Sequence, residues 1–267
     1  MELWTKEHFW QLIPTTIIML IIALILNCFI GKKSLKVRMI PFQILAVLLF
    51  ISEIGKQIAS ATQESGYDLY HIPLHVCSLF IPLLPLMSFY QGKHKDVVRV
   101  ITCSVTLSMV LFMVVYPNLI YGAGNILNFP KFFDDLTNFD YYFDFHTVFF
   151  HNIVIFEFIL IIVLRLHHVD ENKSYLKPVA IFGAVFAIIA AVMSQLLQTN
   201  YANFYTCNVG PVQAFVDSIK EAIGYAAGQT IYVVILGSLH VVFFSGCYYL
   251  YRAIDKLNIK LRGKAEQ

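Results

Sequence analysis

Seven apolar segments of this chain are each long enough to cross a lipid bilayer as an α-helix, which takes about 20 residues. They cover approximately residues 11–30, 39–60, 71–90, 97–116, 143–164, 178–198 and 226–250. Only 13% of the residues are charged, against about a quarter in soluble domains. A soluble globule cannot bury that much apolar surface. The sequence therefore predicts an all-α, polytopic membrane helix bundle with seven transmembrane helices.

Basic residues are concentrated on alternate connections between these segments. The connections that follow the first, third, fifth and seventh segments hold 15 of the 19 basic residues: Lys32, Lys33, Lys36, Arg38, Lys93, Lys95, Arg99, Arg165, Lys173, Lys177, Arg252, Lys256, Lys260, Arg262 and Lys264. Positively charged loops remain in the cytoplasm. This pattern predicts an N-terminus outside and a cytoplasmic C-terminus in a multi-pass protein of the cell membrane.

The first apolar segment is predicted to be a retained transmembrane helix, because its basic cluster follows the apolar core, whereas a signal peptide has basic residues before it. We see no linker, so residues 1–267 are read as a single integral membrane domain. The net charge of +2 gives no indication of a nucleic-acid partner, and the five cysteines show no paired spacing typical of zinc or disulfide frameworks. No cofactor is expected, and the sequence does not predict an oligomeric state.

The outer connections, at residues 61–70, 117–142 and 199–225, carry most of the acidic side chains, and the last two are long for a helix bundle. Apolar residues recur at helical spacing between about residues 211 and 224, with polar residues opposite. This pattern predicts an amphipathic helix at the membrane surface. It either covers the outer mouth of the bundle or packs against it without a role in access.

The third segment begins with HIPLHVCSLF, residues 71 to 80, which places His71, His75 and Cys77 near the outer end of a span. Pro82 and Pro85 cannot donate backbone hydrogen bonds, so we expect a kink one turn below Cys77. Cysteine and histidine together suggest a nucleophile whose thiol proton is drawn off by an imidazole. The alternative is that Cys77 packs and each histidine bonds a neighbouring helix.

The fifth segment carries His146 and His151 at about the same depth as Cys77. Ionisable groups inside a bilayer are costly, so they are candidates for function. We predict Cys77 with His151 as the reacting pair, with His75 or His146 as the orienting residue or second base. His75 and Cys77 point to roughly opposite faces of a helix, so they become partners only if the segment unwinds.

Other readings stay open. His71 and His75 are spaced to share a metal ion that His146, His151 or Asp144 would complete, but the acidic residue of hydrolytic zinc helices is missing, and we expect no metal. Seven spans with buried histidines also suit a small transporter or a pH-responsive sensor.

Several further polar residues have two readings each. Asn200, Tyr201 and Asn203 either bind the oxyanion or headgroup of a substrate or serve as turn residues. Glu53 and Lys56 are predicted to pair across one helical turn, and Glu157 either stabilises a polar cavity or bonds a neighbouring helix.

Three motifs, PLHVC (73–77), FHTVFFHNIVIF (145–156) and NYANFYTC (200–207), occur in an order and spacing similar to one family. The sequence resembles the YwaF-type bacterial integral membrane proteins, which are related to the eukaryotic transmembrane protein 164 family. The resemblance extends from Glu53 to Tyr251.

The resemblance implies a seven-helix membrane acyltransferase that moves fatty acyl chains between glycerophospholipids, so membrane phospholipids are the expected partners. Cys77 matches the family cysteine and His151 the family histidine, while His75, Asn200 and Tyr201 match accessory positions. The sequence departs from the family pattern at Ile72, where leucine is usual, and at Phe150 and Asn152, where serine and glycine flank the histidine. The second departure leaves the choice between His146 and His151 open.

Overall fold

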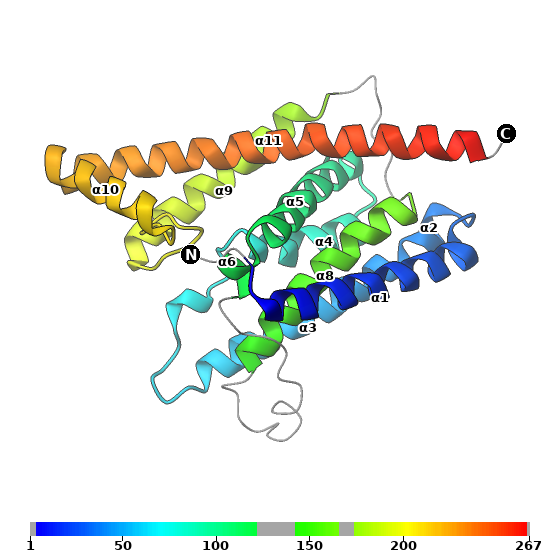
Figure 1. The fold of residues 1–267 in the computed structure, drawn as a ribbon, viewed down its shortest axis with the longest axis horizontal. Helices are drawn as coiled ribbons and strands as arrows, with labels where there is room; N and C mark the ends of the chain where they lie inside the picture. The colour runs from blue at the N-terminus through cyan, green and yellow to red at the C-terminus, as the bar shows by residue number, and fades with distance from the viewer. Residues whose placement is uncertain (1–3, 122–141, 166–173, 266–267) are drawn as a thin grey trace.

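A computed structural model describes residues 4–121, 142–165 and 174–265, and within these ranges the regular elements are helices (Figure 1). The α-helices are α1 (Lys6–Ile30), α2 (Leu35–Arg38), α3 (Ile40–Ala61), α4 (Phe80–Phe89), α5 (Lys95–Val115), α6 (Pro117–Tyr121), α8 (Tyr142–Val163), α9 (Leu176–Leu197), α10 (Gly210–Ile223) and α11 (Tyr225–Ala265). Short 3₁₀ turns cover Leu69–His71 and Cys77–Leu79.

Six stretches of the described residues are helical, long and apolar enough to cross a membrane, and they lie at six of the predicted segments. They are Lys6–Ile30, Leu35–Ala61, Lys95–Val115, Tyr142–Val163, Leu176–Leu197 and Tyr225–Lys260. The protein is therefore an all-helical, multi-pass membrane protein over the part of the chain that the structure describes.

The third predicted span differs from the expectation, because residues 71–79 do not form an α-helix. Only Phe80–Phe89 is α-helical, preceded by the 3₁₀ turn Cys77–Leu79. Ile72 is extended, with φ −59° and ψ 132°, as expected for a residue that precedes a proline. The irregular backbone therefore comes before Cys77. Pro82 lies in the first turn of α4, where no backbone donor is needed, and Pro85 lies inside α4, so the kink expected below Cys77 stays a prediction.

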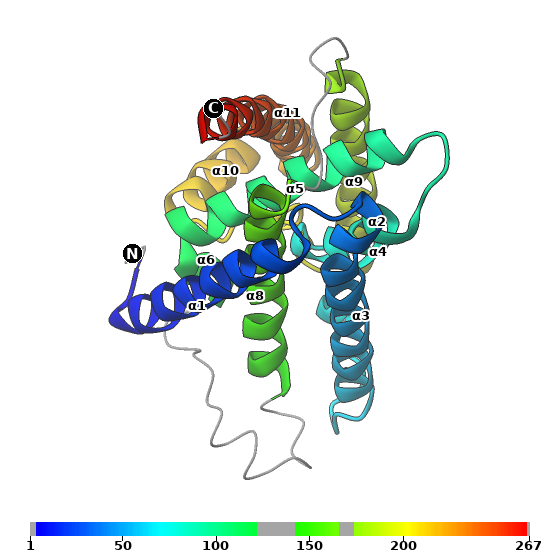
Figure 2. The same ribbon diagram turned by 90° about the vertical axis from the view of Figure 1, so that its right-hand side faces the viewer.

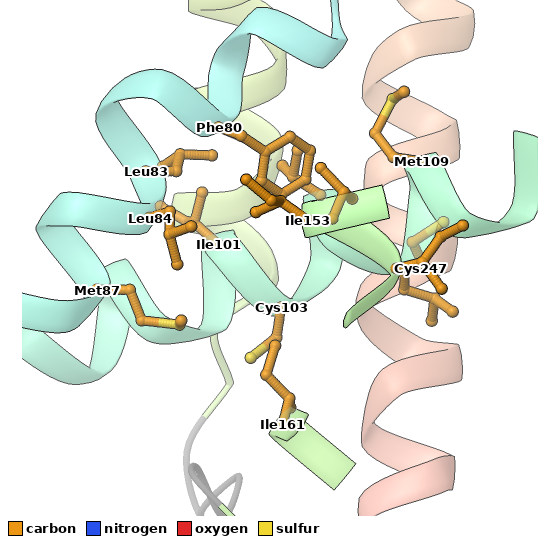
Figure 3. Packing of buried hydrophobic residues seen from close by; sticks show 14 of the residues in the cluster. Phe80, Leu83, Leu84, Met87, Ile101, Cys103, Met109, Ile153, Ile161 and Cys247 are labelled. Carbon is orange, nitrogen blue, oxygen red and sulfur yellow. The ribbon is translucent and has the colours of Figure 1, made fainter. Parts of the chain in front are cut away.

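The helices pack around α5, which contacts α4, α8, α9 and α11. α11 runs along the long axis of the molecule, with α9 and α10 beside its first half, while α1 and α3 lie on the opposite side against α8 (Figures 1 and 2). Figure 3 shows the apolar centre, where Phe80 and Leu84 of α4 meet Ile101 of α5 and Ile153 of α8.

The connections that carry the basic residues meet at one end of this bundle. Arg38 donates hydrogen bonds to the carbonyls of Leu164 and Arg165, at 2.7 and 2.9 Å, and Asn258 of α11 donates to Ile162. Lys173 and most of the predicted 117–142 connection lie outside the described residues. Which end faces the cytoplasm stays a prediction from the charge pattern.

The amphipathic segment forms α10, Gly210–Ile223, which packs against α11. Val216 is buried, whereas Phe215 and Ile223 are exposed, at 65% and 51%. α10 lies at the end of the molecule opposite to the basic connections (Figure 1).

Candidate functional site

A cavity of about 470 Å³ opens at the end of the bundle where two of the connections predicted to be outside, residues 61–70 and 199–225, come together. Residues from α3, α5, α8, α11 and two irregular segments line it. One part of the lining is polar and includes Glu53 and Lys56. The apolar part includes Met109, Phe112 and Leu236. Of the residues predicted as the site, the cavity brings together Cys77, His75, His146, His151, Asn200 and Asn203.

The irregular segment from Leu69 to Val76 forms one wall, and its backbone carbonyls are bonded by side chains from other elements. The hydroxyl of Tyr201 donates to the Leu69 carbonyl, and Gln57 of α3 donates to the His71 carbonyl at 2.9 Å. Backbone without helical hydrogen bonds is tolerated at membrane depth only where such partners exist. The 69–76 segment is thus held in place by α3 and by the loop that contains Tyr201.

This unwound backbone places His75 and Cys77 on the same cavity, as the sequence would require for them to cooperate. The His75 ring packs against Tyr70, with centroids 4.5 Å apart, and against Tyr201 at 5.6 Å. Its Nε2 lies 3.2 Å from the Tyr70 carbonyl, so Nε2 carries the hydrogen and Nδ1 keeps its lone pair. Burial lowers the pKa of His75 to about 4, which keeps the ring neutral at physiological pH.

Helix α8 supplies His146 and His151, which are buried, with 7% and 6% exposed. The Nδ1 atom of His151 lies 2.6 Å from the carbonyl of Thr147, one helical turn earlier. Because a carbonyl only accepts, Nδ1 carries the hydrogen and Nε2 is left as the basic nitrogen. In the part of the chain that the structure describes, no hydrogen bond joins His151 to Cys77, although both line the cavity.

The carboxylate of Glu53 is the charged centre of the polar wall. Lys56 Nζ lies 2.8 Å from Glu53 Oε1, so the predicted pairing across one turn is present. Gln57 donates to the same oxygen at 2.6 Å. His146 Nε2 lies 3.1 Å from Oε2, without the alignment of a regular hydrogen bond. The sequence did not predict that Glu53 and His146 meet.

The loop from Asn200 to Cys207 forms another part of the cavity wall, and its asparagines hydrogen-bond within the loop itself. Asn200 Oδ1 accepts the backbone N–H groups of Tyr205 and Thr206, at 3.2 and 3.1 Å. Asn203 has a left-handed backbone, with φ 67°, a conformation that asparagine tolerates. Their turn chemistry is therefore observed, and their contact with a substrate stays a prediction. Tyr201 contributes through its contacts with Leu69 and His75 rather than as a lining residue.

His71 also lines the cavity and stacks on Phe143, with ring centroids 4.3 Å apart. Within the described ranges, no group of three His, Cys, Asp or Glu side chains is arranged to hold a metal ion. The two histidines predicted as a possible metal pair both contact the Tyr70 ring, and each has a further aromatic partner, Phe143 for His71 and Tyr201 for His75.

Several lining residues were not predicted as part of the site, among them the ionisable residues Glu53, Lys56, Cys207 and His240. His240 could have been selected by the rule that selected His146, since it is an ionisable residue within an apolar span. Cys207 ends the NYANFYTC motif, but nothing in its spacing links it to Cys77. Only the folded chain shows that these residues share one cavity.

The profile of the TMEM164 family matches residues 3–251. The chain belongs to the TMEM164 family. The match includes all the segments that line the cavity, from α3 to α11. Comparison with curated proteins and with solved structures finds no match for this chain.

Proposed function

We propose that this protein is a membrane-embedded acyltransferase that moves fatty acyl chains between glycerophospholipids, or hydrolyses them, through Cys77 and His151. Membership of the TMEM164 family supports this, because the family is linked to acyltransferase-like function. In this proposal the short apolar helix Cys77–Phe89 is the third of seven spans and adds to the six long helices. The seven spans form a single domain in the cell membrane, with the N-terminus outside.

The observation that carries the proposal is a cavity with a thiol, a neutral imidazole nitrogen and both polar and apolar walls. Cys77 and His151 Nε2 provide a nucleophile and a base. A glycerophospholipid has a polar headgroup and apolar chains, which fit the two kinds of wall. The ester carbonyls lie just below the headgroups, at the depth of the outer helix ends. In this proposal Asn200, Tyr201 and Asn203 bind the oxyanion or the headgroup of the substrate.

The absence of a direct Cys77–His151 hydrogen bond is compatible with this chemistry, because catalytic hydrogen bonds are often long before substrate binds. In the reaction, His151 Nε2 takes the thiol proton, the sulfur attacks the ester carbonyl and a thioester forms. Departure of the lysolipid oxygen with that proton completes the first half-reaction. Transfer of the acyl group to another lipid hydroxyl, or to water, regenerates the thiol.

Intact-protein mass spectrometry tests the proposal. Purified protein is incubated with phospholipid vesicles, and wild type is compared with Cys77→Ala, His151→Ala and the matched control Cys103→Ala. We expect a fatty-acyl mass on wild type and Cys103→Ala only. A wild-type protein that never gains this mass under any vesicle composition overturns the proposal.

A second incubation replaces vesicles with acyl-CoA, which is confined to the cytoplasm. Because the cavity opens at the end predicted to be outside, phospholipids should acylate Cys77 and acyl-CoA should not. Rapid consumption of acyl-CoA, with phospholipids ignored, would contradict the proposed orientation of the site.

A further inference from the structure

Glu53 presents its two oxygens to different partners. Oε1 is occupied by Lys56 at 2.8 Å and by Gln57 at 2.6 Å, whereas Oε2 is buried and, among the residues that the structure describes, is paired with His146 Nε2 at 3.1 Å. Glu53 and His146 are 6% and 7% exposed, so little water competes for this contact. One oxygen of the carboxylate is therefore reserved for the imidazole.

This contact indicates which nitrogen of His146 can act as a base. The pair lacks the alignment of a regular hydrogen bond, but an ionised carboxylate repels a nitrogen lone pair at 3.1 Å, so Nε2 of His146 carries the hydrogen and Nδ1 keeps the lone pair. When Nδ1 takes up a proton, the positive imidazolium lies against the Glu53 carboxylate. His151 has no such support, because its bonded nitrogen faces the neutral carbonyl of Thr147.

The two histidines also lie in different surroundings. They are five residues apart on α8, which separates them by about 7.5 Å along the helix axis. The Phe150 ring contacts both histidines, but His151 also contacts the Tyr121 ring, whereas His146 lies beside the Glu53–Lys56 pair. A polar hydroxyl that enters the cavity therefore meets His146 in the charged part of the wall.

We infer that Glu53 is a positioning residue that holds His146 as the base for the acyl acceptor, while His151 serves Cys77. This inference rests on the proposed function. In the second half-reaction, His146 Nδ1 takes the proton of the acceptor hydroxyl and the oxygen attacks the thioester carbonyl. The C–S bond then breaks, the new ester leaves, and the proton returns to the Cys77 sulfur. With water as the acceptor the same steps release a fatty acid.

The test separates the two half-reactions by following acyl-Cys77 with intact-protein mass spectrometry and acyl transfer to a labelled lysophospholipid. Glu53→Gln and His146→Gln should form the thioester at the wild-type rate but transfer the acyl group about 100-fold more slowly, so acyl-Cys77 accumulates. The double variant should be no slower than His146→Gln, because the two residues act as one unit. Glu53→Asp, which keeps the carboxylate, should recover part of the rate.

Controls distinguish this inference from the function on which it rests. Glu157→Gln removes another buried carboxyl that does not line the cavity, and it should transfer like wild type. The inference is overturned if Glu53→Gln transfers the acyl group at the wild-type rate, or if a folded His146→Gln no longer forms the thioester. Neither result contradicts the proposed acyltransferase function. A wild-type protein that never forms the thioester overturns both. If Glu53→Gln does not fold, His146→Gln carries the test, since it leaves the Glu53–Lys56 pair intact.

Discussion

The cavity and the packed centre of the bundle each contain a carboxyl group and a cysteine within apolar helices, yet their surroundings differ. Glu53 lines the cavity and meets a lysine, an amide and an imidazole. Glu157 is fully buried and, within the described ranges, accepts one hydrogen bond, from Thr106 at 3.3 Å. Cys77 lines the cavity, whereas Cys103 is fully buried, close to Ile161 in Figure 3.

The difference teaches that an ionisable residue inside a span indicates function only when the fold gives it both access and charged partners. The same rule selects Glu53 and Glu157 from the sequence, since both are ionisable residues in apolar helices. The structure separates them by the cavity.

Replacing Cys77 by serine should reduce acyl transfer by about 1000-fold or more, because a hydroxyl is a far weaker acid than a thiol and His151 alone does not activate it. Cys103→Ser is the matched control, since a serine hydroxyl can keep the hydrogen bond that Cys103 shares with Tyr251. Turnover measured on lipid vesicles should be unchanged in the control. Full activity of Cys77→Ser would favour a transporter or sensor instead of a thioester-forming enzyme.

Alkylation rates should separate the two cysteines by about 100-fold or more, because Cys77 is reached through the cavity and Cys103 only after unfolding. The measurement is peptide mass spectrometry after timed exposure to iodoacetamide. Cys28 is exposed on α1, so it is first replaced by serine to remove background. Equal protection of both thiols would show that the cavity is closed in the membrane.

Removing the carboxylate charge should affect stability differently in the two regions. Glu53→Gln leaves Lys56 and His146 without their anion, and we expect a loss of about 2 kcal/mol in unfolding free energy. Glu157→Gln keeps an oxygen for the Thr106 hydroxyl and should change stability by less than about 1 kcal/mol. Unfolding in detergent, followed by circular dichroism, measures both. A larger loss for Glu157→Gln would reverse the comparison.

Local features of the sequence predicted most of the fold but not the start of the third span. Apolar length and the alternation of basic loops are local properties, and six candidate spanning helices lie where they indicate. Apolar length alone predicted that the third helix begins at residue 71. This prediction is wrong because Pro73 restricts the backbone of Ile72, which is extended in the structure.

The site was predicted in its residue types but not in its contacts. Cys77, His146 and His151 were selected because ionisable groups in apolar segments are unusual. The Glu53–His146 contact joins residues 93 positions apart, and the Tyr201–Leu69 hydrogen bond joins residues 132 positions apart. Such pairs depend on how helices pack, which a single sequence does not specify.

The Tyr201 hydroxyl tests how firmly the 69–76 segment is held. Tyr201→Phe removes the hydrogen bond to the Leu69 carbonyl and should lower the unfolding free energy by about 1 to 2 kcal/mol. Acyl transfer should fall a fewfold, because the segment positions His75 and Cys77. The matched control is Tyr232→Phe, which removes a hydrogen bond to the Asn203 carbonyl in the 200–207 loop. Equal activity losses in the two variants would show that the 69–76 segment has no special role.

The smallest effect concerns the neutral ring of His75. Burial lowers its pKa from the ordinary 6.5 to about 4, so the unfolded chain takes up a proton before the folded protein does. Stability is therefore lost as the pH falls from about 6.5 toward 4. His75→Gln does not titrate and should lose about 0.5 to 1 kcal/mol less than wild type between pH 7.5 and 5.5, after allowance for partial exposure. Thermal unfolding at both pH values measures this difference. Identical pH dependence in both proteins would show that the folded protein does not keep His75 neutral. His75 Nδ1 would then not be available as a hydrogen-bond acceptor in the cavity.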